Sequence, residues 1–217
     1  MTARKRTAVL ISGRGSNLQA LIDAAKDRAY PAEIALVLSN VAGVQGLERA
    51  SLAGIPTKTI SHRGHPTREA FDAELDRALR ADGIELVCLA GFMRVLSDQF
   101  VRGWEGRLVN IHPSLLPAFK GLHVHRQALE AGVTLSGCTV HFVVSELDSG
   151  PIIAQAAVPV LAGDTEESLA ARTLEAEHRL YPLALKLLAN GSVRLENGRA
   201  RFTGMPVNTG TLFNPLG

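Results

Sequence analysis

Short runs of apolar residues alternate along the chain with longer segments in which apolar residues recur at helical spacing. Alternation of this kind is typical of parallel strands joined by crossover helices. Three of the runs are almost continuously apolar, as expected for strands that helices cover on both faces. We therefore predict a Rossmann-like α/β fold with a mostly parallel, twisted sheet. The predicted strands are 8–11, 33–39, 57–60, 84–90 and 107–111, and the predicted helices are 17–28, 44–53 and 67–81.

The pattern changes after Asn110. A proline-rich loop and a short helix near 125–131 precede two β-rich runs, 138–145 and 151–160, which the turn sequence ELDSG separates. Two extended runs around a short glycine-containing turn predict an antiparallel hairpin that extends the parallel sheet. A long helix should follow, capped by Asp164 with Glu167 three residues later and running to about 189. A second, short hairpin is expected beyond it.

Length and composition narrow the class of protein. The 217 residues suffice for one domain with a sizeable core, and we see no linker to a second one. With 23 basic and 21 acidic residues, the net charge of +2 gives no broad footprint for nucleic acid. Cys88 and Cys138 lie among apolar residues, which favours buried, reduced thiols. No apolar run reaches the length of a membrane span or a signal-peptide core, so we expect a cytoplasmic protein.

A glycine-rich turn follows the first predicted strand and leads into a helix, with the sequence Ser12-Gly-Arg-Gly-Ser-Asn17. Backbone N–H groups at a helix N-terminus, together with the helix dipole, attract phosphate. The dinucleotide fingerprint would need a third glycine and an acidic residue after the second strand, where this chain has Ser39 and Asn40. The loop therefore indicates a phosphate site more than a nicotinamide site. Alternatively, the glycines only form a tight turn and Ser16 or Asn17 caps the helix.

Polar residues with catalytic chemistry stand at the end of the strand 107–111. Asn110 and His112 are two residues apart, so their side chains should leave the same face of that strand. Ligands of open α/β sheets bind at the carboxyl ends of the strands. An amide donor for an oxyanion and an imidazole acid suit acyl transfer to an amine. A nearby carboxylate would keep the histidine protonated, and Asp148 in the hairpin turn is the candidate.

Several histidines lie close together in the sequence or on the predicted strands, and these are His112, His123, His125 and His141. They could suggest a metal centre. However, no HExxH motif or paired-cysteine spacing accompanies them. We therefore expect no metal.

The string NIHPSLLPAFKGLHVHRQALEAG, with GRGSN before it and ELDSGP after it, resembles the phosphoribosylglycinamide formyltransferases. The resemblance extends from about Thr7 to Ala189 and includes AGFMRVL and EAEHRLYP. It implies transfer of the formyl group of 10-formyltetrahydrofolate, as co-substrate, to the primary amine of phosphoribosylglycinamide in de novo purine biosynthesis. It also implies one formyltransferase domain over 1–217, with a phosphate-binding half at about 1–110 and a folate-binding and catalytic half at about 111–217.

The resemblance also implies roles for individual residues. Asn110 would bind the formyl oxygen, His112 would donate a proton, and Asp148 would keep His112 charged. Glu177 would reach the glycinamide end of the substrate. The substrate phosphate would be held by Gly15, Ser16 and Asn17, and the folate by Arg68, Met93, Arg94, Val95, Leu96 and Asn110.

Other readings stay open. A formyltetrahydrofolate deformylase would use the same centre with water as nucleophile, and the segment PAFKG resembles that family. A methionyl-tRNA formyltransferase would need more than residues 190–217 for its basic tRNA-binding domain. A non-catalytic binding module for a nucleotide or phosphorylated ligand is an alternative of another class. We expect small-molecule substrates and neither a nucleic-acid nor a membrane partner, and a homodimer is left open.

Overall fold

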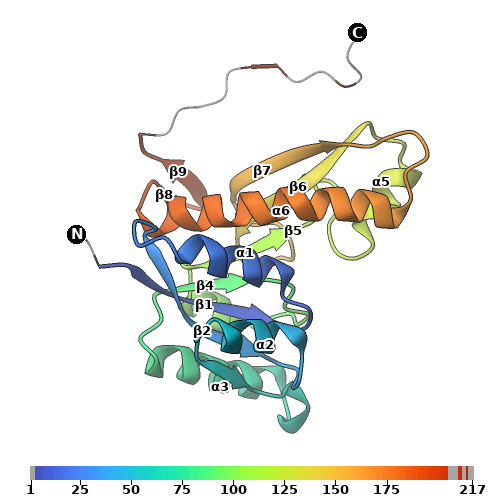
Figure 1. The fold of residues 1–217 in the computed structure, drawn as a ribbon. Coiled ribbons are helices and arrows are strands. Elements are labelled where there is room, and N and C mark those ends of the chain that lie inside the picture. Colours follow the sequence, from blue (N-terminus) through green and yellow to red (C-terminus); the bar gives the residue numbers. More distant parts are fainter. Residues whose placement is uncertain (1–2, 205–209, 212–213, 215–217) are drawn as a thin grey trace.

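The computed structural model describes residues 3–204, 210–211 and 214. Its centre is a seven-stranded sheet with the order β3-β2-β1-β4-β5-β6-β7. The strands β1 to β5 are parallel, whereas β6 runs antiparallel to β5 and β7 antiparallel to β6. The predicted fold class, with its antiparallel hairpin extension, is therefore confirmed (Figure 1).

The elements follow the alternation of the sequence. The strands are β1 (Lys5–Ile11), β2 (Ala32–Ser39), β3 (Thr57–Thr59), β4 (Leu86–Leu89), β5 (Leu108–His112), β6 (Leu135–Phe142), β7 (Ile152–Pro159), β8 (Val193–Glu196) and β9 (Arg199–Phe202). The helices are α1 (Ser16–Ala25), α2 (Gln45–Leu52), the 3₁₀ turn η1 (His62–Gly64), α3 (Arg68–Ala81), α4 (Asp98–Gly103), α5 (Val124–Glu130) and α6 (Glu166–Ala189).

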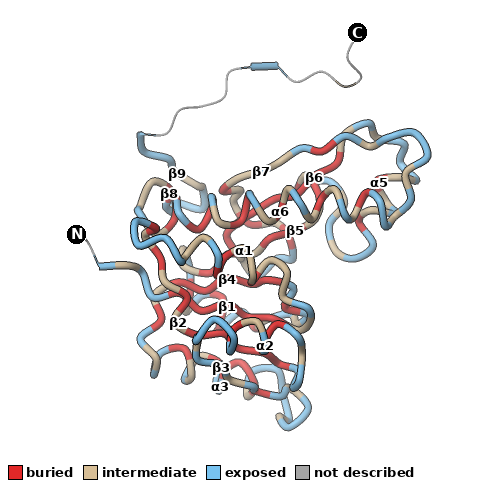
Figure 2. The backbone as a smooth tube through the Cα atoms, in the orientation of Figure 1, coloured by how far each residue is buried: buried red, intermediate tan, exposed pale blue. Residues whose placement is uncertain are grey.

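Two apolar layers cover the sheet. On one face, α1, α2 and α6 pack against alternate strand residues such as Val9 and Ile11. On the other face, α3 and α4 pack against Ala8 and Leu10 through a cluster that includes Trp104. Because both faces are covered, the central strands are buried along almost their whole length, as Figure 2 shows.

Some predicted boundaries were wrong. The first strand begins at Lys5, three residues before the predicted run. The short helix α4 was not predicted, because its six residues carry too few apolar positions for a helical period. The cap of α6 is Thr165, which forms a capping box with Ser168. Asp164 was the predicted cap, but its carboxylate binds Arg172 and the Leu161 N–H instead.

Candidate active site

The glycine loop lies between the end of β1 and α1, and its backbone leaves the helix N-terminus open. Gly15 is the N-cap residue with φ 70°, and no side chain caps the helix. The alternative in which Ser16 or Asn17 caps α1 is therefore wrong. A Cβ atom on Gly15 would stand 2.7 Å from the Cα of Gly46, so only glycine fits this close approach to α2. The loop and Met93 line an open cavity of about 240 Å³.

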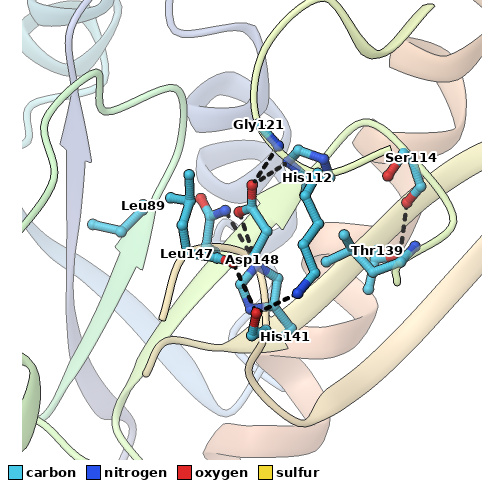
Figure 3. Close-up of polar contacts among 12 residues, drawn as sticks. Leu89, His112, Ser114, Gly121, Thr139, His141, Leu147 and Asp148 are labelled. Carbon is cyan, nitrogen blue, oxygen red and sulfur yellow. Dashed lines mark hydrogen bonds and ion pairs between the residues drawn. The ribbon is translucent and has the colours of Figure 1, made fainter. Parts of the chain in front are cut away.

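Asn110, His112 and Asp148 come together at the carboxyl end of β5. Nδ1 of His112 lies 3.4 Å from Oδ2 of Asp148, and both side chains are buried. Asp148 stands in the turn between β6 and β7 with φ 48°, and its Oδ2 also accepts a hydrogen bond from the Gly121 N–H at 3.0 Å. Figure 3 shows the carboxylate between the two histidines of the site, His112 and His141. The structure therefore brings the three predicted residues into one cluster.

His141 joins this cluster, although the sequence singled it out only as one of several histidines that could suggest a metal centre. The pairing of β5 with β6 places it opposite Asn110. Burial lowers the pKa of His141, and its Nδ1 donates to the Phe142 carbonyl at 2.8 Å. The neutral ring therefore has a lone pair on Nε2, and this atom accepts from Nδ2 of Asn110 at 3.3 Å. The contact orients the amide of Asn110, and only the strand register could have revealed it.

The second ring nitrogen of His112 faces the loop 114–121. Its Nε2 donates to the carbonyl of Phe119 at 2.9 Å. Phe119 has φ 54°, and the next residue, Lys120, reaches across to Ser149 and Glu146 in the turn that carries Asp148. Both ring nitrogens of His112 thus face oxygen acceptors, which is the environment of a doubly protonated imidazole.

A second cavity, of about 100 Å³, opens beside Asn110 and His141. Four of the residues predicted to bind folate line it: Arg94, Val95, Leu96 and Asn110 itself. Met93 is exposed and faces the glycine loop instead. Arg68, the first residue of α3, pairs with Glu69 and lines neither of the two cavities. The folate role of these residues stays a prediction.

Glu177 reaches the glycine loop from α6. Its Oε2 accepts from Nδ2 of Asn17 at 2.6 Å, and Oδ1 of Asn17 is buried without a hydrogen-bond partner. Glu177 is itself only 6% exposed, and this burial raises the pKa of its carboxyl group. Glu177, predicted to bind the glycinamide, and Asn17, predicted to bind the phosphate, are therefore neighbours. Oδ1 of Asn17 remains as an unpaired hydrogen-bond acceptor between the loop and the helix.

The described residues hold neither a cluster of metal-ligating side chains nor a helix that could span a membrane. Among residues 3–204, 210–211 and 214, no group of three or more His, Cys, Asp and Glu side chains could hold a metal ion. Within the same residues, no helix is long and apolar enough to cross a membrane. His125, in α5, lies near His112. Its Nδ1 atom is buried without a hydrogen-bond partner, and burial lowers the pKa of its ring.

The end of β5 carries the amide and the imidazole, and the β6–β7 turn adds the carboxylate, an arrangement that suits an enzyme of group transfer. The family model described as formyl transferase matches residues 5–185, so the chain belongs to the formyl transferase family. Within that family it is similar to the phosphoribosylglycinamide formyltransferase of Escherichia coli K12, with 50% identity over 90% of this chain and 92% of that protein.

Other relatives agree. The crystal structure of glycinamide ribonucleotide transformylase 1 from Symbiobacterium toebii superposes with a TM-score of 0.90 at 50% identity, covering 93% of this chain and 95% of that one. A trifunctional purine biosynthetic protein of Drosophila pseudoobscura is 63% identical over 88% of this chain, which spans only 14% of that protein. A formyltetrahydrofolate deformylase from Pseudomonas syringae is more distant, with a TM-score of 0.84 at 28% identity over 93% of this chain and 66% of that one.

Proposed function

We propose that this chain transfers the formyl group of 10-formyltetrahydrofolate to the primary amine of phosphoribosylglycinamide, a step of de novo purine biosynthesis. The products are formylglycinamide ribonucleotide and tetrahydrofolate. The observation that carries the proposal is the cluster of half-buried Asn110 with buried His112 and Asp148, at the end of β5, which β4 alone separates from the strand that leads into the open glycine loop. The similarity to phosphoribosylglycinamide formyltransferases of matching length supports it.

The cluster suits each stage of that reaction. The amine attacks the formyl carbon, and the formyl oxygen becomes an oxyanion. Nδ2 of Asn110 gives one hydrogen to His141, and its second hydrogen remains for the oxyanion. The intermediate then loses N10 of the folate, which takes up a proton as the C–N bond breaks, and the proton lost by the attacking amine returns the imidazole of His112 to its charged form. His112 supplies the proton to N10, and Asp148 favours its charged form.

The glycine loop and α6 would hold the nucleotide-like substrate. The free N–H groups of Ser16 and Asn17 suit the phosphate, since they stand at the positive end of α1 without a side-chain cap. Glu177 and the unpaired Oδ1 of Asn17 offer hydrogen-bond partners for the glycinamide. Arg94, Val95 and Leu96, with Met93 and Arg68, would contact the folate.

An assay with purified protein tests the proposal. Mixed with 10-formyltetrahydrofolate and phosphoribosylglycinamide, the protein should form tetrahydrofolate and the formylated amine in equal amounts. Release of formate without the amine would instead indicate the deformylase. Binding of both ligands without turnover would indicate a non-catalytic binding module.

We propose that the enzyme works in the cytoplasm with small molecules as its only required partners. Its two cysteines, Cys88 and Cys138, are buried as free thiols, which suits a reducing compartment. Association into a homodimer is a further proposal, which sedimentation at several protein concentrations tests.

A further inference from the structure

Ser12 connects the glycine loop with the loop after β4. Its N–H donates to the carbonyl of Gly91 at 3.1 Å, and its Oγ accepts from the Met93 N–H at 2.8 Å. The hydroxyl proton is donated to Oδ1 of Asn40, only 2.6 Å away. Ser12 therefore holds three hydrogen bonds across the carboxyl ends of β1, β2 and β4.

Asn40 fixes the direction of this hydroxyl. It follows β2 and is only 3% exposed, so its amide must find partners inside the protein. Its Oδ1 accepts from Ser12, so its Nδ2 points the other way. There it lies 3.3 Å from Nδ1 of His62, a residue of η1. With the hydroxyl proton committed to Asn40, a lone pair of Ser12 Oγ is held toward the Met93 N–H.

We propose that Ser12 is a positioning residue that couples occupancy of the phosphate loop to the arrangement of the folate loop. The inference rests on the proposed function, since it takes Gly15–Asn17 as the phosphate site and Met93–Leu96 as a folate site. Ser12 is the first residue of the glycine loop, three residues before Gly15. It also anchors Met93 at the start of the second loop, whose later residues line the cavity beside Asn110.

The coupling follows from the geometry of the hydroxyl. A phosphate bound at Gly15–Asn17 restrains the short glycine loop that begins at Ser12, and so keeps Oγ in the position that accepts from Met93. If either loop moves alone, this hydrogen bond is lost. One net hydrogen bond corresponds to a change of about fivefold in a binding constant. Each ligand should therefore tighten binding of the other by about that factor, as linkage requires.

Calorimetric titration of the full chain measures this factor directly. Tetrahydrofolate, which has no formyl group to transfer, is titrated with and without saturating phosphoribosylglycinamide. We expect the amine substrate to tighten tetrahydrofolate binding about fivefold in the wild-type protein, and less than twofold in Ser12→Ala. Asn40→Ala should reduce the factor as well, and the double variant should show no further loss.

Ser39→Ala is the matched control. Ser39 is fully buried next to Asn40, but its hydroxyl bonds only within its own turn, to the carbonyl and N–H of Val41. The control should lose similar stability and keep the full coupling factor. Equal loss of coupling in Ser39→Ala, full coupling in Ser12→Ala, or a wild-type factor of one would each overturn the inference.

The same titrations separate this inference from the proposed function. Failure of the wild-type protein to bind phosphoribosylglycinamide or tetrahydrofolate at all would overturn both. Binding of both ligands, with turnover but without coupling, would overturn only the role of Ser12.

Discussion

Asp148 faces two histidines, and the contacts of each ring assign them different charges. His141 donates Nδ1–H to a carbonyl and offers the Nε2 lone pair to Asn110, so the site needs it neutral. Burial lowers the pKa of His141 and so favours this neutral form. His112 has acceptors at both nitrogens, which suits a cation. One carboxylate thus stands beside the proposed proton donor, His112, and beside a neutral ring that orients Asn110, the proposed oxyanion donor.

Asn110→Ala should remove the donor to the oxyanion, a charge that exists mainly in the transition state. We expect kcat to fall by roughly 10² to 10³, with KM for both substrates and the melting temperature nearly unchanged. Steady-state kinetics and thermal unfolding measure both quantities. Wild-type turnover in the variant would exclude Asn110 from this role.

Asp148→Asn should keep the hydrogen bond from the Gly121 N–H and remove the negative charge beside His112. Without that charge the proposed proton donor loses its neighbouring counter-ion, so kcat should fall by about 10² or more. Steady-state kinetics measure this fall. Wild-type turnover in the variant would mean that Asp148 acts only by ordering its turn.

Glu177→Gln tests the buried carboxyl group beside the glycine loop. Burial raises the pKa of this carboxyl group in the folded state, so the folded protein favours the protonated form. The stabilisation of the folded state by this proton is complete below about pH 4.3, the pKa of a glutamate in the unfolded chain. The stability is lost as pH rises through the folded value. Glutamine cannot ionise, so the variant should gain melting temperature relative to wild type as pH increases. A constant difference across pH 5 to 9 would show that Glu177 is not held protonated.

At the scale of elements, the sequence predicts what depends on local pattern. Apolar periodicity located the five parallel strands and the three crossover helices, because both signals lie within one element. His141 could not be assigned in this way, since its role depends on the register between β5 and β6. Similarly, Thr165 replaces Asp164 as the cap of α6 because Arg172, eight residues further along, binds the aspartate.

Gly46→Ala tests how α2 supports the glycine loop. A Cβ on Gly46 would lie 2.4 Å from Cδ1 of Ile11 and 3.0 Å from the carbonyl oxygen of Gly13. The loop must shift to make room, so KM for phosphoribosylglycinamide should rise about tenfold, while kcat changes less. Ser51→Ala, an exposed position of the same helix, is the control and should leave KM unchanged. Unaltered KM in Gly46→Ala would mean that the loop adapts to the methyl group.

At the scale of the whole molecule, the two proposed halves, 1–110 and 111–217, share one structure. The boundary falls inside β5, which pairs with β4 on one side and with β6 on the other. The helix α6 packs on α1 as well as on β6 and β7. We therefore propose that neither half folds alone, although their predicted ligand roles differ.

Thermal unfolding of the full chain should then be a single two-state transition, with equal calorimetric and van't Hoff enthalpies. Phosphoribosylglycinamide at about 100 times its dissociation constant should stabilise the native state by about 2.7 kcal/mol. It should therefore raise the midpoint temperature of the single transition. Because α6 carries Glu177 to the glycine loop, a ligand bound at the proposed site would contact both halves and should not split the transition. Two transitions, of which the ligand moves only one, would instead establish two independently folding domains.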